Sequence, residues 1–209
     1  MREARTNTRA DQADQRRAEL LDAARRVVLE RGLASTRVSD IAKEINVSGG
    51  LIHYHFATKD ELITAMLRAT LEEESARLAE LAGAPGSVVS RLDQMLRFYI
   101  PESRSDQSWI IWIDAWAAAL REPAVCEIMY ELELTWITAV EGLIKAGVES
   151  GEFSCDDPRG AAERIDAMLD GLVTRYTLHP AVLTRQRLLE HARIAAAREV
   201  GLPPAAFGD

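Results

Sequence analysis

The chain has 209 residues, of which 47% are hydrophobic and 28% are charged. This length allows one larger domain or two small ones, and the composition is that of a globular protein with a hydrophobic core. The net charge of −8 on its own disfavours a polyanionic partner. No apolar run is long enough to cross a bilayer, and the N-terminus lacks the apolar core of a secretion signal. We therefore expect a cytoplasmic protein that does not contact a membrane.

The first helix is predicted from the helical spacing of apolar residues that begins at Leu20. Gly32 is expected to end this helix after Arg31. Thr36 is then placed to cap a short second helix, and Asn46 occupies a sharp turn where left-handed backbone is tolerated. The sequence thus predicts two helices, the second of them short, before residue 47.

A third short helix is predicted to follow a cap at Ser48, with Ile52 and Phe56 pointing inward one turn apart. Thr58 and Glu61 form a T-x-x-E capping box, which opens a long fourth helix. After a break at residues 83–86, further helices are expected over 87–100, 107–121, 123–150, 157–178 and 184–200. Neither β alternation nor a phosphate-binding glycine loop is present in the sequence, so the fold class is all-α.

The first three helices have the skeleton of a helix-turn-helix, in which the third helix enters the major groove of DNA. Residues 1–59 hold 11 Lys or Arg and 8 Asp or Glu, so the acidic excess of the chain lies elsewhere. Gly49 and Gly50 would let the backbone approach DNA closely. The side chains placed for base edges or phosphate oxygens follow these glycines and are His53, Tyr54, His55 and Lys59.

The run TRVSDIAKEINVSGGLIHYHFATKDEL, from Thr36 to Leu62, resembles the DNA-binding signature of tetracycline-repressor (TetR) type regulators. The shared features are T-x-x-x-x-I-A, V-S at the turn, Y-H-F in the third helix and K-x-x-L. The run departs from the family at Asn46, where glycine is usual, and at Gly50-Leu51, where many members read bases. The resemblance implies that bases are faced by Ser48, Gly49, Gly50, His53 and Tyr54, and that phosphates are held by Thr36, Tyr54, His55 and Lys59.

The same resemblance implies a transcriptional regulator, and more specifically a repressor that binds a palindromic operator in double-stranded DNA and leaves it when a small-molecule effector binds. The expected parts are a flexible basic arm over residues 1–15, a DNA-binding domain over 16–62, and a ligand-binding and dimerisation domain over 63–209. The arginines of the arm either form a disordered tail or contact the DNA backbone or minor groove. No enzymatic activity is implied.

Apolar stripes on the last two long helices predict association into a homodimer through four helices. The alternative is that these stripes pack inside one chain. The predicted dimerisation residues are Ile165, Leu169, Leu172, Tyr176, Leu188 and Ala192.

An aromatic run at residues 107–120 is the most unusual feature of the C-terminal part. Trp109, Trp112 and Trp116 share one helical face, and Asp114 within the run would be costly to bury unpaired. An aromatic wall beside a carboxylate can hold an organic cation, and W-I-x-W before R-E-P resembles the choline-responsive BetI branch of the family. Alternatively the tryptophans form core, with Asp114 in solvent or paired with Arg97 or Arg121. Other residues expected to complete a pocket are Met95, Tyr99, Met129, Glu133, Trp136 and Met168.

Two functions of other classes compete with this reading: a helical enzyme whose active site is the tryptophan-lined cavity, and a protein-interaction module. The sequence shows no defensible nucleophile or acid–base pair. Cys126 and Cys155 have no partner at metal-ligand spacing, so neither a metal nor a cofactor is expected.

Overall fold

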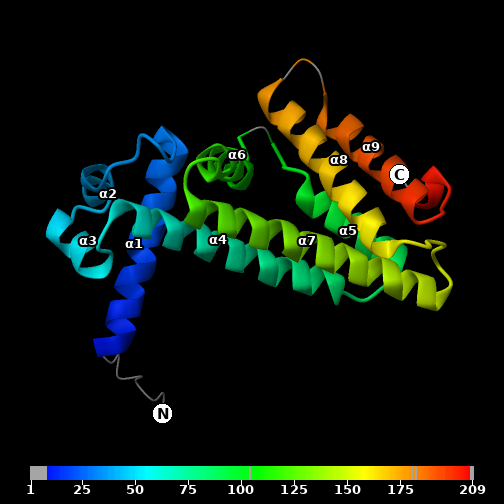
Figure 1. Cartoon of the computed structure of the whole chain (residues 1–209), viewed down its shortest axis with the longest axis horizontal. Helices are drawn as coiled ribbons and strands as arrows, with labels where there is room; N and C mark the ends of the chain where they lie inside the picture. Colours follow the sequence, from blue (N-terminus) through cyan, green and yellow to red (C-terminus); the bar gives the residue numbers. More distant parts are fainter. Residues whose placement is uncertain (1–8, 104, 180, 182, 208–209) are drawn as a thin grey trace, which may run out of the picture. The chain divides into compact units, whose positions relative to one another are not determined.

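The structure, a computed structural model, describes residues 9–103, 105–179, 181 and 183–207. Within these residues it contains helices and no strand, as the sequence predicts (Figure 1). None of the described helices is both long and apolar enough to span a membrane. The elements are α1 (Arg9–Arg31), α2 (Val38–Glu44), α3 (Gly49–His55), α4 (Lys59–Ala82), α5 (Val88–Tyr99), α6 (Gln107–Ala119), α7 (Pro123–Ser150), α8 (Pro158–Leu178), α9 (Arg185–Glu199) and a short 3-10 helix, η1 (Pro204–Phe207).

The described chain forms two compact units. The first contains the residues up to Thr70 together with Asp114–Ile128, and the second contains Leu71–Ile113 and the residues from Met129 onward. The first unit thus extends beyond residues 16–62, the range predicted for the DNA-binding domain, by a further part of α4 and by parts of α6 and α7. Residues 9–15 were predicted to belong to a flexible arm but are helical, because α1 begins at Arg9. Residues 1–8 of the predicted arm lie outside the described residues.

The helix ends of the first unit largely follow their local sequence. Gly32, with a φ of 80°, ends α1 after Arg31, and Asn46 has a φ of 54°, as predicted for both positions. Thr36 is not a helix cap, so the prediction that it caps the second helix is wrong. The residue at the N-cap of α2 is Arg37, whose side chain makes no capping hydrogen bond.

The α3–α4 segment is fixed by two caps that the sequence predicts. The Ser48 hydroxyl accepts a hydrogen bond from the Leu51 N–H at 3.2 Å and so begins α3. The Thr58 hydroxyl accepts from the Glu61 N–H at 3.1 Å, and the Glu61 carboxylate accepts from the Ala57 N–H at 2.7 Å. These bonds satisfy amides that a helix start leaves free, so a tight turn separates the two helices.

The second unit is built around a core shared by the C-terminal part of α4 and by α5, α7, α8, α9 and η1. Figure 1 shows α8 and α9 side by side, and these two helices share the most extensive contact. A two-pronged ion pair also joins α5 to α9, since the Arg193 guanidinium donates to both oxygens of Asp93 at 2.8 and 3.0 Å. Burial would raise the pKa of Asp93, but hydrogen bonds from Arg193 and Arg97 lower it below its ordinary value.

The predicted dimerisation stripe is part of this core. Each of the residues Ile165, Leu169, Tyr176, Leu188 and Ala192 is at most 6% exposed within a single chain. Side chains so enclosed cannot form a surface for a second copy, so their assignment to an interface is wrong and the alternative of packing inside one chain holds. Leu172 packs against the same core while remaining partly exposed.

Gly147 on α7 provides a stability prediction for this core. A Cβ at Gly147 would lie 2.1 Å from a ring atom of the buried Phe153. We expect Gly147→Ala to lower the free energy of unfolding by about 1–3 kcal/mol, because the well-packed ring has to move. Gly142→Ala on the same helix is the matched control, since its Cβ would meet nothing within 4 Å. Urea titration should show that the control is neutral or stabilising; equal effects would contradict the packing argument.

Candidate DNA-binding and effector sites

The exposed face of α3 carries the side chains predicted to contact DNA. Tyr54 is 82% exposed, which removes the alternative that it is half buried, and its ring meets that of His55 edge-on at 5.1 Å. Ile52 and Phe56 are each 1% exposed and anchor the opposite face of the segment. The short helix therefore presents an aromatic and imidazole surface while its core side remains fixed.

The start of α3 is open on its outer side. Ser48 and Gly50 are exposed, and a Cβ at Gly49 would meet nothing within 4 Å. His53 is likewise exposed. The backbone here can consequently come close to another molecule, as the two glycines predict.

Thr36 does not belong to this surface. It is 1% exposed, and its hydroxyl donates to the Gly32 carbonyl at 2.8 Å. The prediction that its side chain holds a phosphate is therefore wrong. Lys59 is half-buried and its Nζ donates to the Leu33 carbonyl at 3.3 Å, which leaves further N–H groups for an anion.

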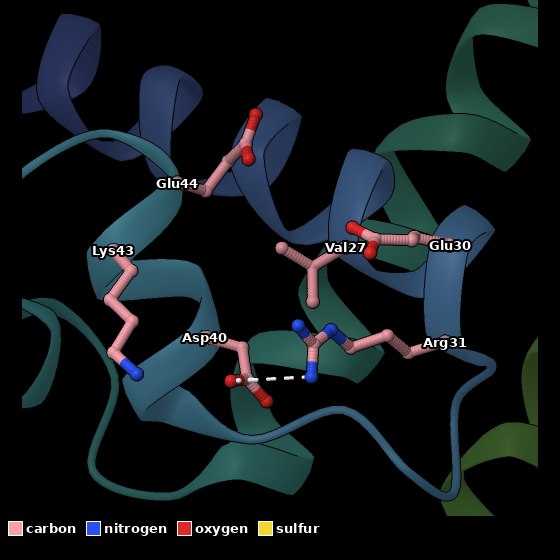
Figure 2. A pocket seen from close by; sticks show the side chains of 6 residues that line it. All are labelled: Val27, Glu30, Arg31, Asp40, Lys43 and Glu44. Carbon is pink, nitrogen blue, oxygen red and sulfur yellow. Dashed lines mark ion pairs between the residues drawn. The ribbon is translucent and has the colours of Figure 1, made fainter.

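A hollow of about 240 Å³ lies between α1 and α2 (Figure 2). Figure 2 shows side chains of both signs around it, including an ion pair between Arg31 Nη1 and Asp40 Oδ1 at 3.5 Å. It contains no predicted site residue and no aromatic ring, so we assign it no ligand. Its lining is Val27, Glu30, Arg31, Asp40, Lys43 and Glu44.

An aromatic cluster in the second unit joins three helices. The ring of Tyr99 lies edge-on to that of Trp136, with centroids 4.5 Å apart, and 5.3 Å from that of Trp109. The Trp109 indole N–H donates to the Tyr99 carbonyl at 2.8 Å, and Phe98 stacks on Trp136 at 5.9 Å. The aromatic wall is therefore built from α5, α6 and α7, whereas the sequence predicts it on one face of α6.

Carboxylates of α8 complete this cluster. The Tyr99 hydroxyl donates to Asp170 and lies 3.4 Å from an Asp166 oxygen. Burial, and then the charges of Asp170 and Glu133, raise the pKa of Asp166 to about 7, although its contact with Tyr99 acts in the opposite direction. Burial also raises the pKa of Asp170, and burial together with both aspartates raises the pKa of Tyr99 well above its ordinary value. The site thus places acidic groups beside aromatic rings. No cation is among the causes of these three pKa shifts.

Several residues predicted to bind ligand lie elsewhere. The Asp114 carboxylate accepts a hydrogen bond from the Leu33 N–H in the first unit, where Trp116 also belongs. The Trp112 indole N–H donates to Glu74 on α4 at 2.8 Å. Met95 is fully buried core and Met129 is buried, whereas Met168 packs at the edge of the core. Among the predicted residues, the structure brings Tyr99, Trp109 and Trp136 together, with Glu133 acting on Asp166 and Asp170.

Asp166 and Asp170 are site residues that the sequence did not predict. Their spacing of four residues places both on one flank of α8, next to the apolar stripe of that helix. The spacing of the two aspartates beside the stripe was a signal that could have been found in the sequence alone. Its aromatic partner Tyr99 is 71 residues away from Asp170, so no local pattern connects them.

A helix-turn-helix with an exposed recognition helix, followed by a separate helical unit, defines a DNA-binding transcriptional regulator. Residues 20–66 match bacterial regulatory proteins of the tetR family, and residues 88–201 match the family described as BetI-type transcriptional repressor, C-terminal. The chain belongs to the BetI-type transcriptional repressors of the tetR family.

Individual relatives agree with this assignment. The chain is 28% identical over 172 residues to the HTH-type transcriptional regulator BetI of Rhizobium meliloti (strain 1021), covering 81% of each chain. It is 26% identical over 177 residues to the HTH-type transcriptional regulator PksA of Bacillus subtilis (strain 168), covering 84% of this chain and 85% of that protein.

The fold is similar to that of a transcriptional regulator from Saccharomonospora viridis solved in complex with choline. The TM-score is 0.79 at 23% identity, over 86% of this chain and 94% of that one. FadR from Bacillus subtilis, solved with stearoyl-CoA, gives a TM-score of 0.68 at 20% identity, over 88% and 97% of the two chains. At these identities the likeness concerns the fold.

Proposed function

We propose that this regulator is a cytoplasmic homodimer that represses by binding a palindromic operator and leaves it when an organic cation binds the second unit. It acts by binding alone, without catalysis. Ser48, Gly49, Gly50, His53 and Tyr54 face bases, while His55, Lys59 and the Tyr54 hydroxyl hold phosphates. The exposed face of α3 supports this assignment, since Tyr54 lies in solvent while Ile52 and Phe56 fix the opposite face of the segment in the core.

The observation that carries the effector class is the carboxylate pair of α8 against the Tyr99 hydroxyl, with Trp109 and Trp136 beside it. Aromatic faces attract cations, and the attraction is strongest where water is excluded. Asp166 and Asp170, rather than Asp114, supply the anionic groups. The choline bound by the Saccharomonospora viridis regulator is of the same chemical class.

A thermal-shift assay with choline, and with its neutral carbon isostere dimethylbutanol, tests the effector class. We expect choline to raise the melting temperature, because a ligand that binds only the folded state stabilises it by mass action, and the isostere to have no effect. Equal shifts with both compounds would show that positive charge is not recognised. Acidic compounds that stabilise the protein while quaternary amines do not would overturn the proposed effector class.

The outward faces of α8 and α9 are the surface that we propose for the dimer, in place of the buried stripe. Small or apolar residues are exposed there, including Ala167, Gly171 and Leu178 on α8, with the partly exposed Ile194 on α9. Close approach of helices needs small residues at the contact, and two copies of the α8–α9 pair form a four-helix interface.

Gly171→Arg is expected to convert the dimer to a monomer and to abolish high-affinity operator binding. A Cβ at Gly171 meets nothing within 4 Å, so one chain tolerates the substitution while the interface does not. Sedimentation equilibrium measures the change. Gly142→Arg is the matched control, because that glycine is equally open but lies on α7. A Gly171→Arg protein that remains dimeric would locate the interface elsewhere.

A further inference from the structure

The turn between α1 and α2 is held by charged groups from two other helices. The N–H of Leu33 donates to the carboxylate of Asp114 on α6, and the Leu33 carbonyl accepts from the Nζ of Lys59, the first residue of α4. The Leu33 side chain is 5% exposed, so the residue is also fixed by packing. One residue of the turn is therefore bound at its amide by an anion and at its carbonyl by a cation.

The turn is shaped to admit this carboxylate. A Cβ at Gly32 would lie 3.2 Å from Asp114 Oδ2, and the φ of 80° at that glycine disfavours any other residue. Asp114 is the sole acidic residue of α6, whose sequence is QSWIIWIDAWAAA. A carboxylate in so apolar a helix is costly unless it is hydrogen-bonded, and the Leu33 amide provides that bond.

We propose that Asp114 is a positioning residue for operator binding, which acts on DNA through Leu33 and Lys59. Lys59 is the side chain proposed to hold a phosphate, so the inference rests on the proposed function. The ammonium group has three N–H donors. Its bond to the Leu33 carbonyl directs the group, and the remaining donors are available for phosphate oxygens.

The two hydrogen bonds at Leu33 support each other. The N–H and the carbonyl of Leu33 lie on the two peptide groups that flank its Cα, so the bond to Asp114 fixes the backbone orientation from which the carbonyl meets Lys59. Hydrogen bonds to charged groups are the strong ones. Loss of the Asp114 carboxylate leaves the Leu33 amide without its partner and loosens the backbone at Leu33. Lys59 then loses a fixed acceptor, and a flexible lysine pays conformational entropy before it can bind a phosphate.

The first test is operator affinity of the full-length protein, measured by fluorescence anisotropy on a duplex that the wild type selects from random-sequence DNA. We expect Asp114→Ala to weaken binding about tenfold, because a Lys59 that is no longer directed has to lose side-chain conformational freedom before it binds a phosphate. Asp114→Asn should recover most of the affinity, because its amide oxygen still accepts from the Leu33 N–H. Glu127→Ala is the charge-matched control in the same unit and should bind as the wild type does, because Glu127 is exposed.

A double-mutant cycle separates positioning from a general loss of fold. If Asp114 acts through Lys59, the combined Asp114→Ala and Lys59→Ala protein binds only slightly more weakly than Lys59→Ala alone. Additive losses, unchanged affinity of Asp114→Ala, or failure of Asp114→Asn to recover binding would overturn the inference. Thermal melts verify that each variant is folded. A wild type that selects no duplex would instead refute the proposed operator contacts, so the two failures are distinguishable.

Discussion

Tyr54→Ala is expected to weaken operator binding about a hundredfold without changing the melting temperature. The side chain is 82% exposed, so its removal leaves no cavity in the fold. A good contact to a base edge or thymine methyl is worth roughly tenfold or more in affinity. Each protomer of the proposed dimer contributes one Tyr54, so the substitution removes two such contacts and the two losses of affinity multiply.

The matched control for Tyr54 is Tyr130→Ala. Tyr130 is 60% exposed but lies on α7 in the second unit, so the same chemical change is made away from the recognition helix. Anisotropy titrations on the selected duplex should separate the two variants by about two orders of magnitude. Tyr54→Phe then distinguishes a phosphate contact of the hydroxyl from a base contact of the ring. Equal affinities of the two alanine variants would remove Tyr54 from the operator contacts.

The helix-turn-helix could be predicted because its determinants are local. Caps such as Ser48 and the Thr58–Glu61 box satisfy amides within four residues, and Asn46 takes the backbone conformation that its turn requires. Thr36 shows where local reasoning fails. The hydroxyl of a threonine before a short helix can accept a hydrogen bond from an N–H of that helix or donate one to a preceding carbonyl. The turn at Gly32 favours donation, because it places the Gly32 carbonyl within reach of the Thr36 hydroxyl.

The proposed effector site was less predictable, because an apolar or charged pattern in the sequence does not identify the residues that it contacts. The stripe of α8 is a sound prediction of burial, but periodicity is the same whether a helix packs within its chain or against another. Asp114 shows the same limit for charge. Its acceptor role depends on Leu33, which lies 81 residues away, so the aromatic neighbours in sequence misleadingly suggested a ligand.

Affinity for choline is expected to rise about tenfold between pH 6 and pH 8. Asp166 has a pKa of about 7 because it is buried close to Asp170 and Glu133, so it is mostly protonated at pH 6 and mostly ionised at pH 8. A cation favours the ionised form of Asp166. Binding below the pKa must expel the proton, so the affinity falls by up to about tenfold for each pH unit below pH 7 and changes little above it. Titration calorimetry in buffers of different ionisation enthalpy should detect proton release near pH 7.

Asp166→Asn is expected to remove this pH dependence and to weaken choline binding at pH 8, whereas Asp156→Asn, at an exposed position, should change neither. A wild-type affinity that is constant from pH 6 to pH 8 would exclude Asp166 as the titrating group. Ionisation of Tyr99 does not contribute to the pH dependence in this range, because burial and the two aspartates raise the pKa of Tyr99 well above its ordinary value.

The same raised pKa predicts that the ionised Asp166 destabilises the folded chain and that a bound cation offsets this effect. Because the folded-state pKa of Asp166 is raised above 3.8, the folded chain binds more protons than the unfolded chain between about pH 4 and pH 7. Stability therefore falls as pH rises through that window, and Asp166→Asn should raise the free energy of unfolding at pH 8 by about 2 kcal/mol. A bound cation neutralises the same repulsion, so the stabilisation by choline should be larger at pH 8 than at pH 6. The opposite order would mean that the carboxylates of α8 do not meet the ligand.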